Sequence, residues 1–260
     1  MIVLKDISKF YPPTARGAKP VLAVDHVSAE IEEGEFVCIV GPSGCGKTTV
    51  MNMVAGFESV SQGEIRVGGN LVSKPGPERA VVFQQPSLLP WMTVFDNIGF
   101  GLTLQEERKT RQRDKVAQMI ATMGLGGFEG HFPYQLSGGM QQRAAIARAL
   151  ITEPEILLMD EPFGALDAQT RTDMQKFLLA VWERLRPTVL FITHDVEESI
   201  VLADRVIVMT PRPGRIAETI DIGLGRPRNW DMILSPEFLR YKKEVLTILR
   251  PPRDGPQSAG

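Results

Sequence analysis

The stretch FVCIVGPSGCGKTT, from Phe36 to Thr49, determines the fold class of this chain. It opens with an uninterrupted apolar run, Phe36–Val40, which predicts a strand buried on both faces. The residues that follow, Gly41–Thr48, fit the pattern G-x-x-x-x-G-K-[ST], and a helix-like segment comes after them. A buried strand, a glycine-rich loop and a helix in this order predict an α/β protein whose loop binds the phosphates of a nucleoside triphosphate.

The residue types in the loop suit that chemistry. Glycines let backbone N–H groups converge on a polyphosphate, and the helix adds the positive end of its dipole. Lys47 can neutralise charge on the β- and γ-phosphates, which makes it a catalytic candidate, and the Thr48 hydroxyl can ligate Mg²⁺. The alternative is an ordinary glycine-rich turn before a helix. The predicted nucleotide contacts are Gly41, Pro42, Ser43, Gly44, Cys45, Gly46, Lys47, Thr48 and Thr49.

Cys45 lies within this loop, close to Lys47 and to a helix N-terminus. These surroundings stabilise a thiolate. We therefore expect maleimide to modify Cys45 faster than Cys38, and bound MgATP to protect Cys45.

Two adjacent acids follow another apolar run, Ile156–Met159. Asp160 is suited to hold Mg²⁺ directly or through water, and Glu161 to orient and polarise an attacking water. The alternative is a solvated strand end that stops at Pro162. The Lys47 loop elsewhere in the chain favours the catalytic interpretation.

His194 follows a further apolar run, in the sequence ITHD. The carboxyl ends of parallel strands meet at one edge of a sheet, where functional groups gather. We therefore expect His194 to lie beside Asp160 and Glu161. The other histidines, His26 and His131, have no such context and are interpreted as structural.

The apolar runs predict a mostly parallel sheet, because each is apolar at consecutive positions. These runs are Phe36–Val40, Ala80–Phe83, Ile156–Met159, Thr188–Ile192 and Arg205–Met209. A charged stretch with helical spacing, Leu104–Met123, predicts a helical subdomain, and Pro236–Leu249 predicts a final amphipathic helix. Pro12–Pro20 predicts a long hairpin loop between two edge strands, and Pro251–Gly260 a frayed tail.

The bulk composition narrows the function classes. The chain has 260 residues with a formal net charge of -2, which gives no support for nucleic-acid binding. Its two cysteines fit no disulfide framework, so we expect a reducing, cytosolic compartment. The N-terminus does not resemble a signal peptide, and no apolar run approaches the ~20 residues of a membrane-spanning helix. Any role at a membrane is therefore expected to be peripheral.

A second glycine-containing motif, LSGGMQQR at Leu136–Arg143, closely resembles the signature sequence of ATP-binding cassette (ABC) proteins. Physically it is a small anion site, in which the Ser137 hydroxyl and the N–H groups of Gly138 and Gly139 lie at the start of a predicted helix, Met140–Leu150. The alternative, a serine N-cap followed by two glycines, does not explain the whole string.

The resemblance covers essentially the whole chain, with the motifs in the family's order. It implies an α/β fold of the P-loop NTPase type: an ABC cassette with a mostly parallel core sheet, an antiparallel β edge subdomain and a helical signature subdomain. The implied ATPase domain spans residues 1–235, with the helical subdomain inserted at about 86–150. Residues 236–260 form a C-terminal helix and a disordered tail.

The resemblance also implies roles for single residues on the nucleotide. Tyr11 resembles the aromatic residue that stacks on adenine, with Phe10 as the alternative. Gln84, in the sequence VVFQ, resembles the glutamine that senses Mg²⁺ and the γ-phosphate, and is a candidate metal-binding and catalytic residue. His194 resembles the switch histidine, and Gln141 is implied as a further nucleotide contact.

The resemblance further implies a head-to-tail dimer, made of two copies of this chain or of a pair of related cassettes. Each ATP, bound with Mg²⁺, lies between the Lys47 loop of one subunit and the Ser137–Gly139 segment of the other. The segment Ala165–Asp167 resembles the loop that crosses the dimer interface, so Asp167 is an implied nucleotide-site residue. Hydrolysis and phosphate release let the halves part.

A finer resemblance lies in the string LLPW, Leu88–Trp91. It is similar to importer cassettes for nitrate, sulfonate, taurine, bicarbonate and related small solutes. An exposed pair, Leu88 and Leu89, with Trp91 suits a groove that grips a helix of a membrane permease. The alternative is that Trp91 belongs to the core of the helical subdomain.

The resemblance implies a peripheral subunit on the cytoplasmic face of a prokaryotic inner membrane, in a complex with permease subunits and a solute-binding protein. The competing hypotheses are an exporter subunit, a soluble ABC ATPase of DNA repair or translation, and a metabolic kinase. A soluble ABC ATPase usually carries long coiled-coil insertions or two fused cassettes, and a kinase leaves LSGGMQQR unexplained. The argument against an exporter rests on Leu88–Trp91.

Overall fold

The glycine-rich loop joins a central strand to a helix, as predicted. The computed structural model describes residues 1–13, 19–104, 109–228 and 230–250. Strand β3 (Phe36–Val40) is buried along its whole length and leads through the loop to helix α1 (Lys47–Ala55).

Strand β3 lies inside a six-stranded sheet of order β10-β9-β3-β8-β7-β6. All pairs are parallel except that of β10 with β9. The predicted mostly parallel core sheet is therefore confirmed, with boundaries one residue different in several strands. The other strands are β6 (Arg79–Val82), β7 (Ile156–Asp160), β8 (Thr188–Thr193), β9 (Arg205–Met209) and β10 (Ile216–Asp221).

A second, antiparallel sheet has the order β2-β1-β4-β5. Its strands are β1 (Ile2–Tyr11), β2 (Val21–Ile31), β4 (Gln62–Val67) and β5 (Asn70–Leu71). Tyr11 pairs with Val21, so the predicted hairpin is confirmed, while most of its loop lies outside the described residues. Only β2 is an edge strand, because β1 pairs with β4 on its other side. Helix α1 packs between the two sheets, where Val50 and Val54 join a buried cluster with Ile2 and Ile39.

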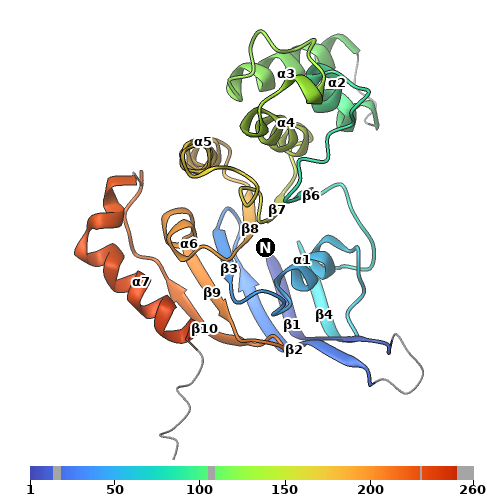
Figure 1. Cartoon of the computed structure of the whole chain (residues 1–260). Helices are drawn as coiled ribbons and strands as arrows, with labels where there is room; N and C mark the ends of the chain where they lie inside the picture. The colour runs from blue at the N-terminus through green and yellow to red at the C-terminus, as the bar shows by residue number, and fades with distance from the viewer. Residues whose placement is uncertain (14–18, 105–108, 229, 251–260) are drawn as a thin grey trace, which may run out of the picture.

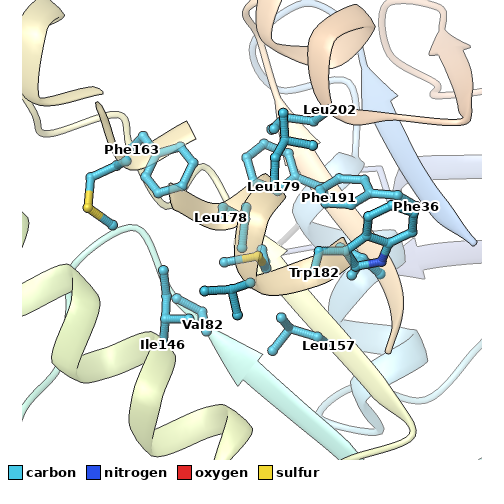
Figure 2. Packing of buried hydrophobic residues seen from close by; sticks show 14 of the residues in the cluster. Phe36, Val82, Ile146, Leu157, Phe163, Leu178, Leu179, Trp182, Phe191 and Leu202 are labelled. Atoms are coloured by element: carbon cyan, nitrogen blue, oxygen red, sulfur yellow. The ribbon is translucent and has the colours of Figure 1, made fainter. Parts of the chain in front are cut away.

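The opposite face of the parallel sheet is covered by helices (Figure 1). Helix α5 (Ala168–Leu185) places Trp182 edge-on to Phe36, with ring centroids 5.6 Å apart, and Phe191 lies 5.9 Å from Phe36 (Figure 2). Alternate residues of β3 enter the two clusters, Phe36 and Cys38 on this face and Ile39 on the other. Uninterrupted apolar strands are therefore explained by burial on both faces.

The helical subdomain forms a separate group of elements at one end of the molecule (Figure 1). Helix α4 begins at Gly138, two positions before the predicted start, because Ser137 is its N-cap. The predicted helix over Leu104–Met123 is observed as a 3₁₀ turn ending at Leu104 and helix α3, and residues 105–108 lie outside the described part. The elements are α2 (Val94–Gly99), the 3₁₀ turn Phe100–Leu104, α3 (Lys109–Thr122), the 3₁₀ turn Pro133–Gln135 and α4 (Gly138–Leu150).

The segment between β6 and α2 is held from two sides. The fully buried side chain of Asn97 accepts a hydrogen bond from Leu89 N at 2.8 Å and donates at 3.0 Å to the carbonyls of Leu89, Met92 and Thr93. The guanidinium of Arg148, on α4, donates to the carbonyls of Ser87 at 2.9 Å and Pro86 at 3.3 Å. The path of this irregular segment is thus fixed by side chains rather than by a strand or helix.

The C-terminal helix α7 (Pro236–Leu249) has the predicted boundaries and follows a 3₁₀ turn, Trp230–Leu234. Its buried Phe238, Tyr241 and Val245 enter the same cluster as Trp182. The predicted tail, residues 251–260, lies outside the described residues.

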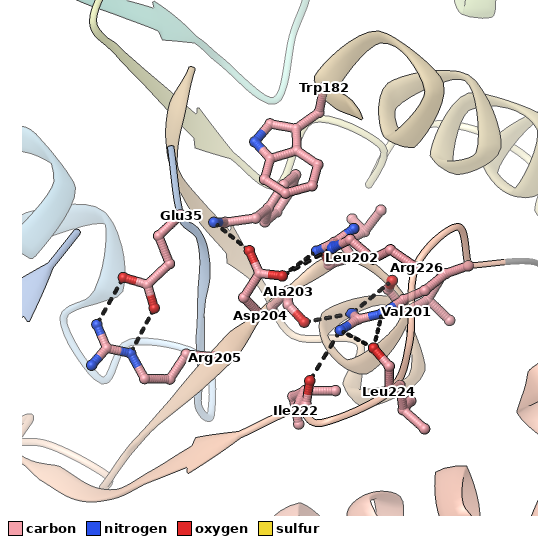
Figure 3. A network of polar contacts seen from close by, with 12 residues as sticks. Glu35, Trp182, Val201, Leu202, Ala203, Asp204, Arg205, Ile222, Leu224 and Arg226 are labelled. Carbon is pink, nitrogen blue, oxygen red and sulfur yellow. Dashed lines mark hydrogen bonds and ion pairs between the residues drawn. The ribbon is translucent and has the colours of Figure 1, made fainter. Parts of the chain in front are cut away.

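A network of arginine hydrogen bonds caps the C-terminal end of helix α6 (Val196–Leu202), in the region that Figure 3 shows. The guanidinium of Arg228 donates to the carbonyls of Ile200, Val201 and Ala203, which are orphan acceptors at a helix C-terminus, and to those of Ile222 and Leu224. Burial lowers the pKa of Arg228 to about 10. Asp204 accepts from Arg226 at 2.7 Å and from Phe36 N at 3.0 Å, which ties this network to β3.

Candidate functional site

The loop between β3 and α1 needs glycine at two positions. Gly44 and Gly46 have φ angles of 74° and 102°, in the left-handed region that other residues avoid. Gly46 is also the N-cap of α1 and, having no side chain, makes no side-chain capping hydrogen bond. Backbone N–H groups at a helix start are suited to hold phosphate oxygens.

The Lys47 side chain folds back over its own loop. Its ammonium donates to the carbonyls of Gly41 at 2.9 Å and Pro42 at 3.2 Å, and the residue is only 6% exposed. The charge is thereby held beside the loop that would receive a phosphate.

Thr48 and Asp160 are in direct contact across the sheet edge. The Thr48 hydroxyl donates to both carboxylate oxygens of Asp160, at 3.0 and 3.2 Å. Burial raises the pKa of Asp160, and the charge of Glu161 adds to the rise, while the Thr48 hydrogen bond and Lys47 oppose it. A hydroxyl and a carboxylate at this spacing are oxygen donors of the kind that Mg²⁺ prefers.

Glu161 and His194 meet at the same edge, as the sequence predicted. His194 Nδ1 lies 2.9 Å from Glu161 Oε2. Glu161 follows β7 with a positive φ of 43°, and its N–H donates to the Ile192 carbonyl of β8 at 2.9 Å. The sheet therefore fixes the backbone of Glu161, and the contact with His194 fixes its carboxylate.

Gln84 is the second residue after the edge strand β6, and it is exposed, with its amide near Gly164. A Cβ on Gly164 would come within 3.0 Å of Gln84 Nε2, so a larger residue at 164 would push the amide aside. Gly164 N donates to the Glu161 carbonyl at 3.0 Å. Gln84 is thus placed next to the turn that carries Glu161.

Tyr11, at the end of β1, lies near the start of α1. Its hydroxyl donates to Glu58 at 2.6 Å and lies 3.4 Å from the Thr49 hydroxyl. Burial, and after it the hydrogen bond to Glu58, raises the pKa of Tyr11. The alternative aromatic residue, Phe10, is exposed on the neighbouring position.

The signature segment contacts the start of α5 in the same chain. A Cβ on Gly138 would lie 3.4 Å from the Leu166 side chain, and one on Gly139 would meet Thr170 at 2.8 Å. Asp167 caps α5 by accepting from Thr170 N at 3.0 Å, and hydrogen bonds from the side chain and then the backbone of Thr170 lower its pKa. Both glycines thus permit close approach of α5.

The side chain of Gln141 faces inward. Its amide donates to the carbonyls of Pro133 at 3.0 Å and Leu136 at 3.2 Å. The Gln141 amide holds the turn before the signature in this structure, and its contact with nucleotide stays a prediction.

The expectation that Cys45 forms a thiolate is wrong. Cys45 is 1% exposed, and burial raises its pKa, outweighing the opposing effects of Lys47 and of backbone hydrogen bonds. Proximity to a lysine and a helix start was the correct observation, but the side chain points into the cluster between the sheets rather than toward solvent.

Two further side chains near the loop were missed by sequence reasoning. Glu58 binds the Tyr11 hydroxyl and pairs with Lys9 at 3.4 Å. Arg212, in the turn between β9 and β10, would lie 3.9 Å from a Cβ on Gly44, and its charge acts on Tyr11. The turn is pinned to β2 by paired backbone hydrogen bonds between Gly214 and residues 23 and 25, a long-range contact that no local pattern signals.

The geometry brings an ammonium, a hydroxyl, two carboxylates and an imidazole to the carboxyl edge of β3, β7 and β8. The sequence profile of the ABC transporter family matches residues 24–164, and an ABC transporter ATP-binding protein of Methanocaldococcus jannaschii is 50% identical over 230 residues, 88% of this chain and 85% of that protein. This chain belongs to the ABC transporter family.

Further ABC proteins resemble it over nearly their whole length. A taurine import ATP-binding protein of Rhizobium johnstonii is 43% identical over 261 residues, 98% of each chain. In Synechocystis, a bicarbonate transport and a nitrate import ATP-binding protein are 43% and 44% identical, over 95% and 88% of this chain and 88% and 89% of those proteins. A solved dimeric bacterial ABC transporter cassette matches with a TM-score of 0.75 and 31% identity, over 86% of this chain and all of that one.

The family membership makes the chain an ATP-hydrolysing cassette, and the ABC resemblance of the sequence is confirmed in fold and in family. Within residues 1–13, 19–104, 109–228 and 230–250, no helix is both long and apolar enough to cross a membrane.

Proposed function

We propose that this chain hydrolyses ATP, with Mg²⁺, to energise import of a small solute through a membrane permease on whose cytoplasmic side it docks. The observation that carries the proposal is the convergence of Lys47, Thr48 and Asp160 with the Glu161–His194 pair at one sheet edge. The direction and the solute class rest on the relatives that import taurine and nitrate and transport bicarbonate.

The side chains divide the chemistry between them. The N–H groups of the loop and Lys47 bind the phosphates, once Lys47 releases the carbonyls of its own loop. Thr48 and Asp160 would hold Mg²⁺, and the ion would supply charge neutralisation at the phosphates. Glu161 orients the attacking water and accepts its proton, while His194 fixes the carboxylate of Glu161. Gln84, over Gly164, reports the state of the γ-phosphate.

In this proposal the adenine base of ATP stacks on the ring of Tyr11. Its contact with Thr49 and the nearby charge of Arg212 place the Tyr11 ring beside the loop. Phe10 remains the alternative, since it is exposed on the next position of the same strand.

A second copy of the chain, or a related cassette, completes each site. Figure 1 shows α4 among the elements of the helical subdomain and apart from α1. Within the described residues, no hydrogen bond joins the 41–48 loop to the 137–141 segment of the same chain. We propose that Ser137, Gly138 and Gly139 bind the γ-phosphate held by the partner, with Asp167 at the interface. The solved dimeric cassette supports this arrangement.

The permease contact is proposed at Trp91, whose side chain is 71% exposed. The alternative that Trp91 is core is therefore wrong. The two leucines before it differ from the expectation of an exposed pair: both are half-buried, and Leu88 packs against the main core. Trp91 thus carries the exposed part of this surface, and a solute-binding protein completes the proposed import complex.

Uptake measurements test the proposal. The chain is co-expressed with the permease and solute-binding subunits and reconstituted in vesicles, and accumulation of taurine, nitrate and bicarbonate is measured with and without internal MgATP. ATP-dependent accumulation of one of them is expected. Efflux of an internal solute, or ATP hydrolysis with no effect on any of the three, would contradict the import assignment.

A further inference from the structure

Beneath the His194 turn lies a carboxylic acid that the mechanism above does not use. Glu198, on α6, is 5% exposed and faces helix α5. Burial raises its pKa to about 7; the charge of Asp195 adds to the rise, and hydrogen bonds from Thr193 and Gln175 and the charge of Arg171 oppose it. Burying an ionisable side chain this completely costs free energy, so hydrogen bonds to it are expected to serve the structure or the site.

Glu198 joins two elements through its two oxygens. Gln175 of α5 donates to Oε1 at 2.6 Å, and the Thr193 hydroxyl donates to Oε2. The same Thr193 hydroxyl accepts from Asp195 N at 2.9 Å. The residues on both sides of His194 are thus fixed by one hydroxyl, whose orientation depends on Glu198.

The hydrogen bond from Gln175 connects Glu198 to α5, the helix that begins at the proposed dimer interface. Gln175 lies two turns along α5 from Asp167, the N-cap of that helix. Arg171, between them, donates to the Leu166 carbonyl at 3.0 Å and acts electrostatically on Glu198. The N-terminal end of α5 also contacts the signature glycines through Leu166 and Thr170.

We propose that Glu198 is a positioning residue that ties α5 to the backbone of His194, so that the Asp167 end of α5 and the His194–Glu161 contact move together. The proposal rests on the proposed roles of His194 and Glu161. Contacts at the proposed interface would then be connected to the carboxylate that orients the attacking water. The connection runs from Asp167 along α5 to Gln175, and from there through the hydrogen bonds of Glu198 and Thr193 to His194.

The choice of substitution separates positioning from mere packing. In Glu198→Gln the amide oxygen still accepts from Thr193, and its NH₂ can donate to Gln175 Oε1, an atom that is buried and has no partner in the described structure. A flip of either amide therefore restores the bridge. Glu198→Ala removes the bridge altogether. Ser199→Ala is the matched control, because Ser199 is buried next to Glu198 on α6, and among the described residues its hydroxyl bonds only the Val196 carbonyl of the same helix.

The first measurement uses the imidazole NMR resonances of the full chain, which contains three histidines. In Glu198→Ala we expect the His194 resonances to shift and broaden, with those of His26 and His131 unchanged as internal controls. Glu198→Gln and Ser199→Ala are expected to leave all three in place. Unmoved His194 resonances in Glu198→Ala would overturn the proposal. Gln175→Ala, which removes one arm and keeps the carboxylate, replaces Glu198→Ala if that variant does not fold, and the same His194 shift is expected.

The second measurement is ATP hydrolysis. We expect Glu198→Ala to lower kcat about tenfold with the KM for ATP within about twofold, and Glu198→Gln to stay within about threefold of wild type. On a His194→Ala background the Glu198→Ala change should lower kcat no further, because residues acting through one group are not additive. Full additivity would overturn the proposal. A His194→Ala variant with wild-type kcat would instead remove the proposed role of His194, while the NMR result would still decide whether Glu198 positions it.

Discussion

His194 Nδ1 and Glu161 Oε2 lie 2.9 Å apart, although 33 residues separate them in the chain. The contact exists because β7 and β8 are parallel neighbours whose carboxyl ends coincide, with Asp160 paired to Ile192. It places an imidazole on one oxygen of the carboxylate and leaves the other available for water.

Replacement of that carboxylate gives the first prediction. Glu161→Gln keeps the shape and the contact with His194 but cannot accept a proton from water. We expect retained ATP binding, a more stable ATP-bound dimer and a hydrolysis rate lower by ~10²-fold or more. Phosphate release and size-exclusion chromatography with MgATP measure both effects. Glu218→Gln, at an exposed residue of β10, is the control, and near-wild-type turnover of Glu161→Gln would refute the assignment.

The two thiols provide a second prediction. Both are buried, and burial raises the pKa of each, that of Cys38 the more strongly. At pH 7 we expect maleimide to label neither side chain of the native chain within minutes and both after unfolding in urea, as followed by mass spectrometry. Rapid native labelling of Cys45 would mean that the 41–48 loop opens to solvent.

A third prediction concerns partner docking. Trp91→Ala should leave the melting temperature and basal ATPase unchanged, because the side chain is exposed, yet abolish co-purification with the permease. Leu88→Ala should lower the melting temperature, because Leu88 packs against the core. Leu234→Ala removes another exposed apolar side chain, on the 3₁₀ turn before α7, and should retain the permease. A Trp91→Ala variant that still assembles would place the docking surface elsewhere.

Asn97 supplies a fourth prediction. Its amide oxygen accepts one backbone hydrogen bond and its two N–H groups are shared among three carbonyls between Leu89 and Thr93, and leaving several buried groups unpaired destabilises by roughly 2–3 kcal/mol. We expect Asn97→Ala to lose permease binding as Trp91→Ala does, and in addition to increase hydrogen exchange across residues 86–93. Hydrogen-exchange protection of residues 86–93 that is unchanged from wild type would show that the Asn97 hydrogen bonds are dispensable.

The fifth prediction follows from the buried Glu198. Its folded pKa of about 7 lies above the ordinary value of 4.5, so the stabilising contribution is fully present below pH 4.5 and is lost as the pH rises through 7. Between pH 5 and pH 8 the wild type should therefore lose roughly 2–3 kcal/mol of unfolding free energy relative to Glu198→Gln, which cannot ionise. Urea denaturation at the two pH values measures the difference. Parallel pH profiles of the two proteins would show that Glu198 has an ordinary pKa.

The parts of the fold that could be predicted are those encoded locally. The apolar runs that lead to Gly41, Asp160 and His194 are buried on both faces, so the strands, to within one residue at their ends, and their common edge followed from sequence alone. Helix α7 was also predictable, because Ser235 caps it and apolar residues recur on one face.

The parts that escaped prediction depend on contacts between distant segments. Nothing near Cys45 indicates that its side chain turns into the core, and nothing near Leu88 indicates that it packs inward while Trp91 points out, because an irregular segment has no period. The bridge from Gln175 to Glu198 joins two helices whose packing is decided by the whole sheet. In the sequence, this bridge corresponds to nothing more than single polar residues among apolar neighbours.

The position of β6 at the edge of the parallel sheet has a mechanical consequence. Between Pro86 and Trp91 the backbone is held by hydrogen bonds from Asn97 and Arg148, so we expect the segment to move as a unit. Its inner end is Gln84, and the strand behind it is supported by β7 on one side. If the permease docks at Trp91 as proposed, a displacement of its helix would be passed along this segment to the turn that carries Glu161, and a movement of that turn on hydrolysis would be passed back by the same path.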